Sequence, residues 1–170
     1  DQVVGTAEHP GVFSAEQVDA LAMAIDNIDR GAAFIIGDQT GVGKGRFVAG
    51  MMRYGMMQGK TPIFVTARPG LYADMFRDLR DIGMNPMALL TNGDLRGANR
   101  IPLVENEFLE SMPPGKIPGV MNQIAATGKL PEGYDALFTT YSQMQFGTKG
   151  SRYPRHDALV DRQRRDLFAD

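Results

Sequence analysis

Apolar residues recur every three or four positions in three parts of the chain, the spacing expected when one face of a helix is buried. The first of these parts, residues 14–30, starts at Ser14, and Ser14 and Gln17 have the spacing of a capping box. Gly31 then stands where the helix would end in a left-handed conformation. The same spacing predicts two further helices, over residues 45–58 and 71–82. In the last of these the apolar face comprises Tyr72, Met75, Phe76, Leu79 and Ile82.

Short, mostly apolar runs alternate with these helices. Such runs are typical of parallel strands that are covered on both faces. Parallel strands that alternate with helices form a sheet with right-handed crossovers, so the pattern predicts an α/β fold in which helices flank a parallel sheet. The predicted strands are residues 32–36, 62–66, 87–90 and 136–140.

Residues 92–131 interrupt this alternation. The segment holds five of the ten prolines and many glycines, with short stretches of helical character only at 104–110 and 120–126. A structureless loop of this length is unusual inside a compact domain. We therefore predict a Pro/Gly-rich insertion that is either functional or partly mobile.

Length and composition fit one globular unit. A chain of 170 residues with a net charge of −2 is long enough to bury a core and has no overall basic charge that would indicate nucleic acid. The lack of cysteine excludes disulfides, thiolate metal sites and a cysteine nucleophile. No apolar run approaches the ~20 residues that cross a bilayer, so we expect a cytosolic protein without membrane contact. Because the chain starts at Asp1 and stops abruptly at Asp170, we expect a fragment of a longer protein.

The segment FIIGDQTGVGKGRFV, residues 34–48, has the strand, glycine loop and helix order of a phosphate-binding loop. Glycines there let backbone N–H groups turn toward phosphate oxygens, and Lys44 would neutralise the β and γ phosphates. Two positions depart from the strict pattern. Asp38 replaces the first glycine, and Gly45 replaces the Ser or Thr whose hydroxyl holds Mg²⁺. The alternative is a glycine-rich turn at a strand–helix junction that binds no ligand.

The loop resembles motif I of helicase and translocase ATPases, in which an acidic residue often stands at the position of Asp38. Its run IGDQTGVGKGR resembles the ATPase domain of the strawberry notch family, a branch of the superfamily-two helicase-like proteins. This resemblance extends from about residue 13 to residue 144 and implies a RecA-like P-loop NTPase that uses ATP and Mg²⁺. It implies that Lys44 is catalytic and that the 38–46 loop holds the ATP phosphates. The implied phosphate-binding residues are Gly41, Val42, Gly43, Lys44, Gly45 and Arg46.

Gln17 has two candidate roles. Its stretch, AEQVDALAMAI, is placed like the adenine-reading Q motif of the family, upstream of Lys44. A side-chain amide can both donate to and accept from the adenine edge. The alternative is that Gln17 only closes the capping box with Ser14, and both roles could hold in turn.

Two further stretches resemble nucleic-acid-binding motifs of the family. FVTARPGLYADMFRDLRDIG resembles motif Ia and FTTYS resembles the motif Ib region. Hydroxyl and guanidinium groups there would contact a nucleic-acid backbone without reading its sequence. The alternative is that they are polar residues at the ends of buried strands. The candidates are Thr66, Arg68, Thr139, Thr140 and Ser142.

The Walker B pattern, an apolar run ending in Asp-Glu, does not occur. The resemblance places it some tens of residues after the TTYS segment at residues 139–142, so residues 1–170 are predicted to be the first RecA-like lobe, incomplete because it ends before Walker B. We expect Mg²⁺ to be held by that downstream acid and by water, so no metal ligand is assigned here. The parent would carry a second RecA-like lobe, act on DNA as an ATP-hydrolysing helicase or translocase, and come from a bacterium, phage or plasmid. The fragment alone is expected to be inactive.

Two alternatives compete with this hypothesis. A small P-loop kinase or GTPase would need an acceptor site or a base-reading motif such as Asn-Lys-x-Asp, and neither occurs. A non-catalytic scaffold module would keep the nucleotide-binding fold without turnover. An Asp-Glu run further along the parent chain would favour the ATPase.

Overall fold

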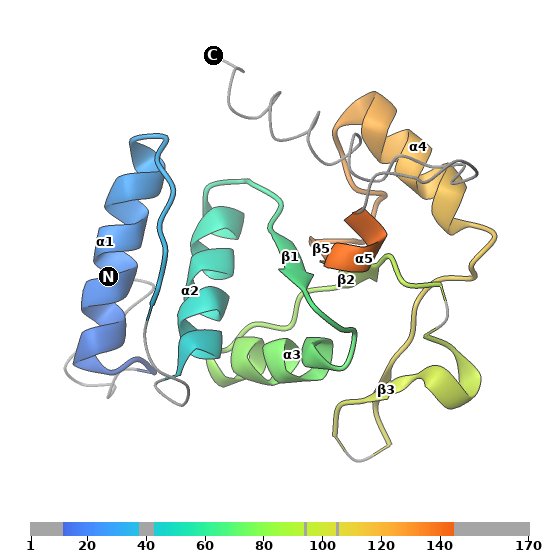
Figure 1. The fold of residues 1–170 in the computed structure, drawn as a ribbon, viewed down its shortest axis with the longest axis horizontal. Coiled ribbons are helices and arrows are strands. Elements are labelled where there is room, and N and C mark those ends of the chain that lie inside the picture. The colour runs from blue at the N-terminus through green and yellow to red at the C-terminus, as the bar shows by residue number, and fades with distance from the viewer. Residues whose placement is uncertain (1–11, 38–42, 94, 105, 145–170) are drawn as a thin grey trace. The chain divides into compact units, whose positions relative to one another are not determined.

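The structure, a computed structural model, describes residues 12–37, 43–93, 95–104 and 106–144 (Figure 1). Its backbone contacts divide the chain into two units: residues 1–60 with 74–85, and residues 61–73 with 86–170. None of the helices in these described ranges has the length and apolar character needed to span a membrane.

Three helices build the first unit: α1 (Ala15–Asp29), α2 (Lys44–Met57) and the greater part of α3 (Leu71–Asp81). The capping box predicted for α1 is present, since Ser14 and Gln17 each bond to the other's backbone N–H, at 3.0 and 3.3 Å. Gly31 follows the helix with φ of 75°, in the left-handed region. The end predicted for α1 is therefore also confirmed.

Side chains fasten α1 and α3 to α2. Leu21 on α1 is 1% exposed and packs on Gly50, where a Cβ would lie 3.0 Å from its methyl carbon. The Tyr54 hydroxyl on α2 donates to the Asp29 carboxylate at 2.7 Å. Beyond α3, the Ile82 carbonyl accepts a hydrogen bond of 2.8 Å from the Arg53 guanidinium. All five residues predicted for the apolar face of this helix are buried.

The predicted strand at residues 32–36 is absent, which corrects the sequence interpretation. These residues have no regular secondary structure, and Ile35 is 90% exposed. A strand exists only where a neighbour pairs with its backbone groups. The described residues of this unit include no strand, so the apolar run has no ladder to join.

A three-stranded parallel sheet forms the centre of the second unit, in the order β1 (Ile63–Thr66), β5 (Ala136–Thr140), β2 (Ala88–Leu90) (Figure 1). The other three predicted strands are thus confirmed, and the fold is of the α/β class. All five residues of the central strand β5 are buried. Its pairing on both sides leaves β5 no free edge.

Successive side chains of β5 pack on opposite faces of the sheet. Leu137 joins Leu89 in a cluster with Ile117, Met121 and Ile124 of α4 (Ile117–Thr127). On the other face, the ring of Phe138 lies 5.1 Å from that of Phe64 and 5.4 Å from that of Tyr72. Helical residues therefore cover both faces of the sheet, as the sequence pattern predicts.

The Pro/Gly-rich segment contains more regular structure than predicted. A 3-10 turn, η1 (Gly97–Asn99), precedes an antiparallel pair of β3 (Ile101–Pro102) and β4 (Phe108–Leu109). The predicted helix at 104–110 is therefore wrong. Asn106 has φ of 59°, a left-handed conformation that interrupts a helix but suits the tip of a hairpin. The second predicted helix is confirmed as α4 and begins at Ile117, and a short α5 (Tyr141–Met144) follows β5.

The core around β5 yields a prediction about stability. Phe138 has no exposed surface and contacts two other rings, so Phe138→Ala leaves a cavity in the sheet. We expect a loss of about 3–5 kcal/mol in the free energy of unfolding, measured by urea denaturation. The control is Val104→Ala, at a side chain that is 61% exposed, for which a change within about 0.5 kcal/mol is expected. Equal effects of the two variants would contradict a core centred on β5.

Candidate functional site

The glycine-rich loop leads into the first turn of α2. Asp38, Gly41 and Val42, three positions of the predicted phosphate-binding loop, lie outside the described residues. Gly43 has φ of 77°, a backbone conformation that favours glycine, and Lys44 is the first residue of α2. The order of glycine, lysine and helix predicted for a phosphate-binding loop is therefore present at this point.

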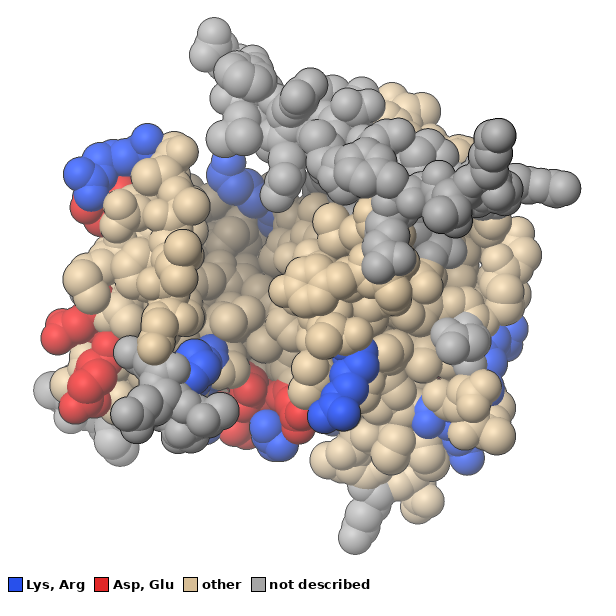
Figure 2. Space-filling model, viewed as in Figure 1, with Lys and Arg blue, Asp and Glu red and all other residues tan. Residues whose placement is uncertain are grey.

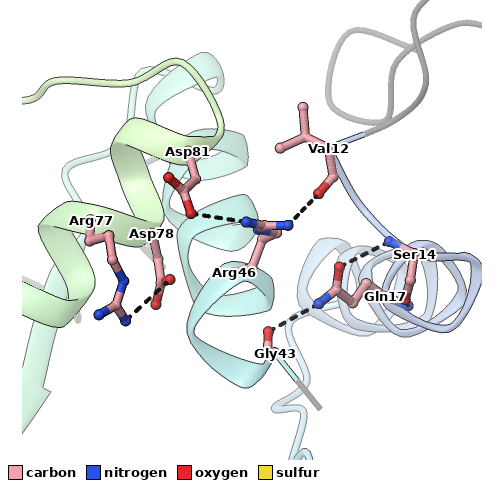
Figure 3. Close-up of polar contacts among 8 residues, drawn as sticks. All are labelled: Val12, Ser14, Gln17, Gly43, Arg46, Arg77, Asp78 and Asp81. Carbon is pink, nitrogen blue, oxygen red and sulfur yellow. Dashed lines mark hydrogen bonds and ion pairs between the residues drawn. The ribbon is translucent and has the colours of Figure 1, made fainter. Parts of the chain in front are cut away.

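Gln17 reaches this turn from α1 (Figure 3). While its amide oxygen accepts the capping-box bond, its amide nitrogen donates to the Gly43 carbonyl at 3.2 Å. The approach is so close that a Cβ on residue 43 would lie 2.2 Å from that nitrogen. Gln17 thus closes the cap and supports the loop at the same time. A contact between Gln17 and adenine stays a prediction.

Arg46 is held on two sides. Its guanidinium donates to the Val12 carbonyl at 3.1 Å and forms an ion pair of 2.9 Å with Asp81 of α3 (Figure 3). The Arg46 side chain therefore links Val12, three positions before the start of α1, to Asp81 on α3. The predicted phosphate contact of Arg46 stays a prediction.

A second carboxylate of α3 explains the glycine at position 45. A Cβ there would lie 1.9 Å from the nearer Asp78 carboxylate oxygen and 2.9 Å from the carboxyl carbon, so a larger residue would displace Asp78. The Asp78 side chain is only 17% exposed. Burial raises the pKa of this carboxyl, while the Arg77 guanidinium acts in the opposite direction. Sequence reasoning missed Asp78, and its one signal was a glycine where a hydroxyl is usual.

Charges of both signs alternate along α3. Arg77 pairs with Asp74 at 3.1 Å and lies 3.7 Å from Asp78. Figure 2 shows acidic and basic side chains next to one another along the lower edge of the view, where Figure 1 places α3. Among the described residues no group of three or more His, Asp or Glu side chains is arranged to hold a metal by itself. A metal at this turn would therefore need ligands beyond the described side chains.

Hydroxyl groups gather at the carboxyl ends of the three parallel strands, the edge at which α/β sheets bind ligands. Thr66 ends β1 and Thr140 ends β5, while Thr91 follows β2 and donates to the Thr139 hydroxyl at 2.8 Å. Asn92 joins this group and lies 3.4 Å from the Thr140 hydroxyl. These hydroxyls satisfy one another inside the fold.

The predicted nucleic-acid contacts therefore differ in accessibility. Thr66, Thr139 and Thr140 are buried, the last two with 1% of their surface exposed. Arg68 and Ser142 are exposed at the same end of the strands that precede them. Ser142 lies 3.0 Å from Thr140, so it connects the buried group to the surface. A role in binding nucleic acid stays a prediction for all five.

Known proteins share sequence with this chain. Residues 2–167 match the family described as P-loop containing NTP hydrolase pore-1. Protein strawberry notch homolog 1 of Gallus gallus is 41% identical over 81 residues, which cover 43% of this chain and 6% of that protein. Protein strawberry notch homolog 2 of Homo sapiens is 36% identical over 86 residues, 46% of this chain and 6% of that protein.

Protein strawberry notch of Drosophila melanogaster is 36% identical over 80 residues, 43% of this chain and 5% of that protein. The chain thus spans about 6% of the length of the curated relatives that it matches. No solved structure matches it. The resemblance to the strawberry notch family is confirmed for this part of the chain.

Two variants separate the two bonds of Gln17. Gln17→Glu keeps the acceptor of the capping box and removes the donor to Gly43, whereas Ser14→Ala weakens the cap and leaves that donor in place. We expect Gln17→Glu to weaken ATP binding about tenfold, the effect of losing one hydrogen bond of roughly 1.4 kcal/mol. Ser14→Ala should instead lower stability by roughly 0.3–1.5 kcal/mol without changing affinity.

The measurements are nucleotide titrations and urea denaturation. They are repeated at high salt, which screens the charge that glutamate adds. A loss shared by ATP and GTP identifies loop support, and a loss confined to ATP identifies a contact with adenine. If Gln17→Glu leaves the affinity for both nucleotides unchanged, Gln17 serves only to cap α1 and has no role in nucleotide binding.

Proposed function

Because the chain belongs to the family of P-loop containing NTP hydrolase pore-1 proteins, we propose that it is the ATP-binding part of a DNA-dependent ATPase of strawberry notch type, acting as a helicase or translocase. The chain is then part of a first RecA-like lobe, with an insertion at residues 92–131. ATP binds between this lobe and a second one, and hydrolysis drives their opening and closing along the DNA backbone.

One observation carries the proposal: Lys44 opens α2 directly after a left-handed glycine. The backbone N–H groups of a first helical turn have no partners within the helix, and Gly43 has no side chain to cap them. Together with the positive end of the helix dipole they favour a phosphate. The lysine adds a full positive charge at the same point, where the β and γ phosphates would lie.

Each proposed ligand residue has a role in this arrangement. The backbone of residues 41–46 surrounds the phosphates, Lys44 neutralises charge that develops during hydrolysis, and Gln17 supports the loop and reads the adenine. Mg²⁺ accompanies the nucleotide, as in other P-loop hydrolases. The DNA backbone is contacted by Arg68 and Ser142 at the surface, with Thr66, Thr139 and Thr140 behind them.

The assignment of DNA as the polymer rests on the similarity to helicase-like proteins. The net charge of −2 supplies no general attraction to DNA, so binding would depend on local contacts such as those of Arg68. A cytoplasmic location, in a bacterium or in the host cell of a phage or plasmid, completes the proposal.

Lysine removal tests the proposal in the intact protein. We expect DNA-stimulated ATP hydrolysis in the natural sequence and a fall in kcat on the order of 10²-fold or more in Lys44→Ala, the usual cost of removing one preorganised group that stabilises transition-state charge. The matched control is Lys60→Ala, which removes the same charge at an exposed position after α2. ATP turnover is measured with and without DNA.

Two results would contradict the proposed helicase or translocase activity. Equal turnover in the natural protein and Lys44→Ala would show that the hydrolysis does not come from this site. ATP binding without turnover, with or without DNA, would identify a nucleotide-binding scaffold.

A further inference from the structure

The space beside Gly45 is filled by a carboxylate from another helix. The nearer Asp78 oxygen stands 1.9 Å from where the Cβ of residue 45 would be. In the usual phosphate-binding loop this position carries a Ser or Thr hydroxyl that binds Mg²⁺. An oxygen ligand is therefore present beside the turn although the residue at position 45 has no side chain.

The surroundings of Asp78 do not neutralise its charge well. Arg77, its nearest ion-pair partner among the described residues, is 3.7 Å away and is also bonded to Asp74. Arg46 is engaged with Asp81, and the negative charges of Asp74 and Asp81 lie on the same helix. Burial raises the pKa of the Asp78 carboxyl, as expected when its charged form is partly deprived of water. A further cation beside this carboxylate would offset part of the cost of its burial.

We propose that Asp78 is an oxygen ligand of the divalent cation that accompanies the nucleotide, in place of the hydroxyl missing at position 45. This assignment rests on the proposed nucleotide site and adds a ligand to it. Mg²⁺ prefers hard oxygen ligands, and nucleotide sites commonly hold it through one or two carboxylates, substrate phosphates and several waters. A carboxylate that is 17% exposed fits this description, because its open side leaves room for water.

A purely structural role is the alternative. In that case Gly45 only permits α2 and α3 to approach, and Asp78 contributes packing. The two roles differ in what Asp78→Asn does, because asparagine keeps the shape and removes the charge. If Asp78 only packs, Asp78→Asn should keep its full response to the metal, whereas loss of a ligand should weaken metal binding. In either case, replacing a partly desolvated charge should leave the melting temperature of the nucleotide-free protein unchanged or higher.

The first experiment compares nucleotide affinity with and without metal in the intact protein. Fluorescent ATP is titrated in EDTA and in a Mg²⁺ series, and Mn²⁺ binding to the protein–nucleotide complex is followed by electron paramagnetic resonance. For Asp78→Asn we expect Mn²⁺ and Mg²⁺ to bind on the order of tenfold more weakly, the lower end of losses seen around metal sites. Affinity in EDTA should be equal or tighter, since a negative charge near the phosphates has been removed.

Asp74→Asn is the matched control. It makes the same change of charge one turn earlier on α3, at a side chain that is 54% exposed and paired with Arg77. We expect its metal affinity to stay within about twofold of the natural protein, as for an exposed ion pair worth ~0–1 kcal/mol. Equal losses in both variants would overturn the proposal in favour of a general effect of helix charge.

A rescue experiment gives an independent answer. Asp78→Ala alone should lose metal affinity like Asp78→Asn, and adding Gly45→Ser should restore it, because the serine hydroxyl then has both room and the usual ligand position. Adding Gly45→Ala instead should restore nothing. Rescue by both residues would indicate packing and overturn the assignment of Asp78 as a ligand.

The outcomes also distinguish a failure of the proposed role of Asp78 from a failure of the proposed nucleotide site. If the natural protein binds no nucleotide in EDTA or in Mg²⁺, the proposed nucleotide site is wrong and the ligand role fails with it. If the natural protein binds nucleotide and Asp78→Asn keeps its full response to Mg²⁺ and Mn²⁺, only the role of Asp78 is wrong.

Discussion

The first turn of α2 is crowded from two directions, and the arrangement of the first unit depends on that crowding. From α1, the Gln17 amide comes within 2.2 Å of where a Cβ of residue 43 would stand. From α3, the Asp78 carboxylate comes within 1.9 Å of the same point at residue 45. A side chain at either position would displace the Gln17 amide or the Asp78 carboxylate from the turn. Glycine at both positions therefore lets the polar ends of these two side chains, one from each neighbouring helix, reach the turn.

Crowding also gives the unusual loop a physical explanation. Gly45 departs from the common pattern of Ser or Thr, and taken alone it removes a magnesium ligand. In the fold the same glycine admits a carboxylate that is largely shielded from water. The Asp78 carboxylate therefore occupies the space that a side chain at position 45 would fill. The polar ends of Gln17 and Asp78 converge on the first turn of α2, whose N–H groups have no partners within the helix.

The second unit depends on a different constraint, the complete burial of β5. A strand covered on both faces and paired on both edges must satisfy every polar group inside the protein. The threonines at its carboxyl end do so by bonding to Thr91 and Asn92 from the neighbouring strand end. The Tyr72 hydroxyl extends the group by donating to Asn92 at 2.7 Å. The polar groups at this edge therefore bond to one another inside the fold, whereas Arg68 and Ser142 are exposed.

Local signals were enough to predict several elements from sequence. The capping box and Gly31 define α1 because caps involve residues only three or four apart. The apolar face of α3 follows from a helical period that no distant residue can alter. The helix that begins at Lys44, directly after Gly43, likewise follows from the order of residues alone.

Tertiary structure decided the features whose partners are distant in sequence. Residues 32–36 have the composition of a buried strand, but a strand needs a neighbour with which to pair, and composition does not report one. Asn106 turned a helical-looking stretch into a hairpin through one left-handed residue. Asp78 stands 33 positions after Gly45 and resembles the other charged residues of an exposed helix face. Only the folded chain brings its carboxylate against the turn, because that contact depends on how α3 packs against α2.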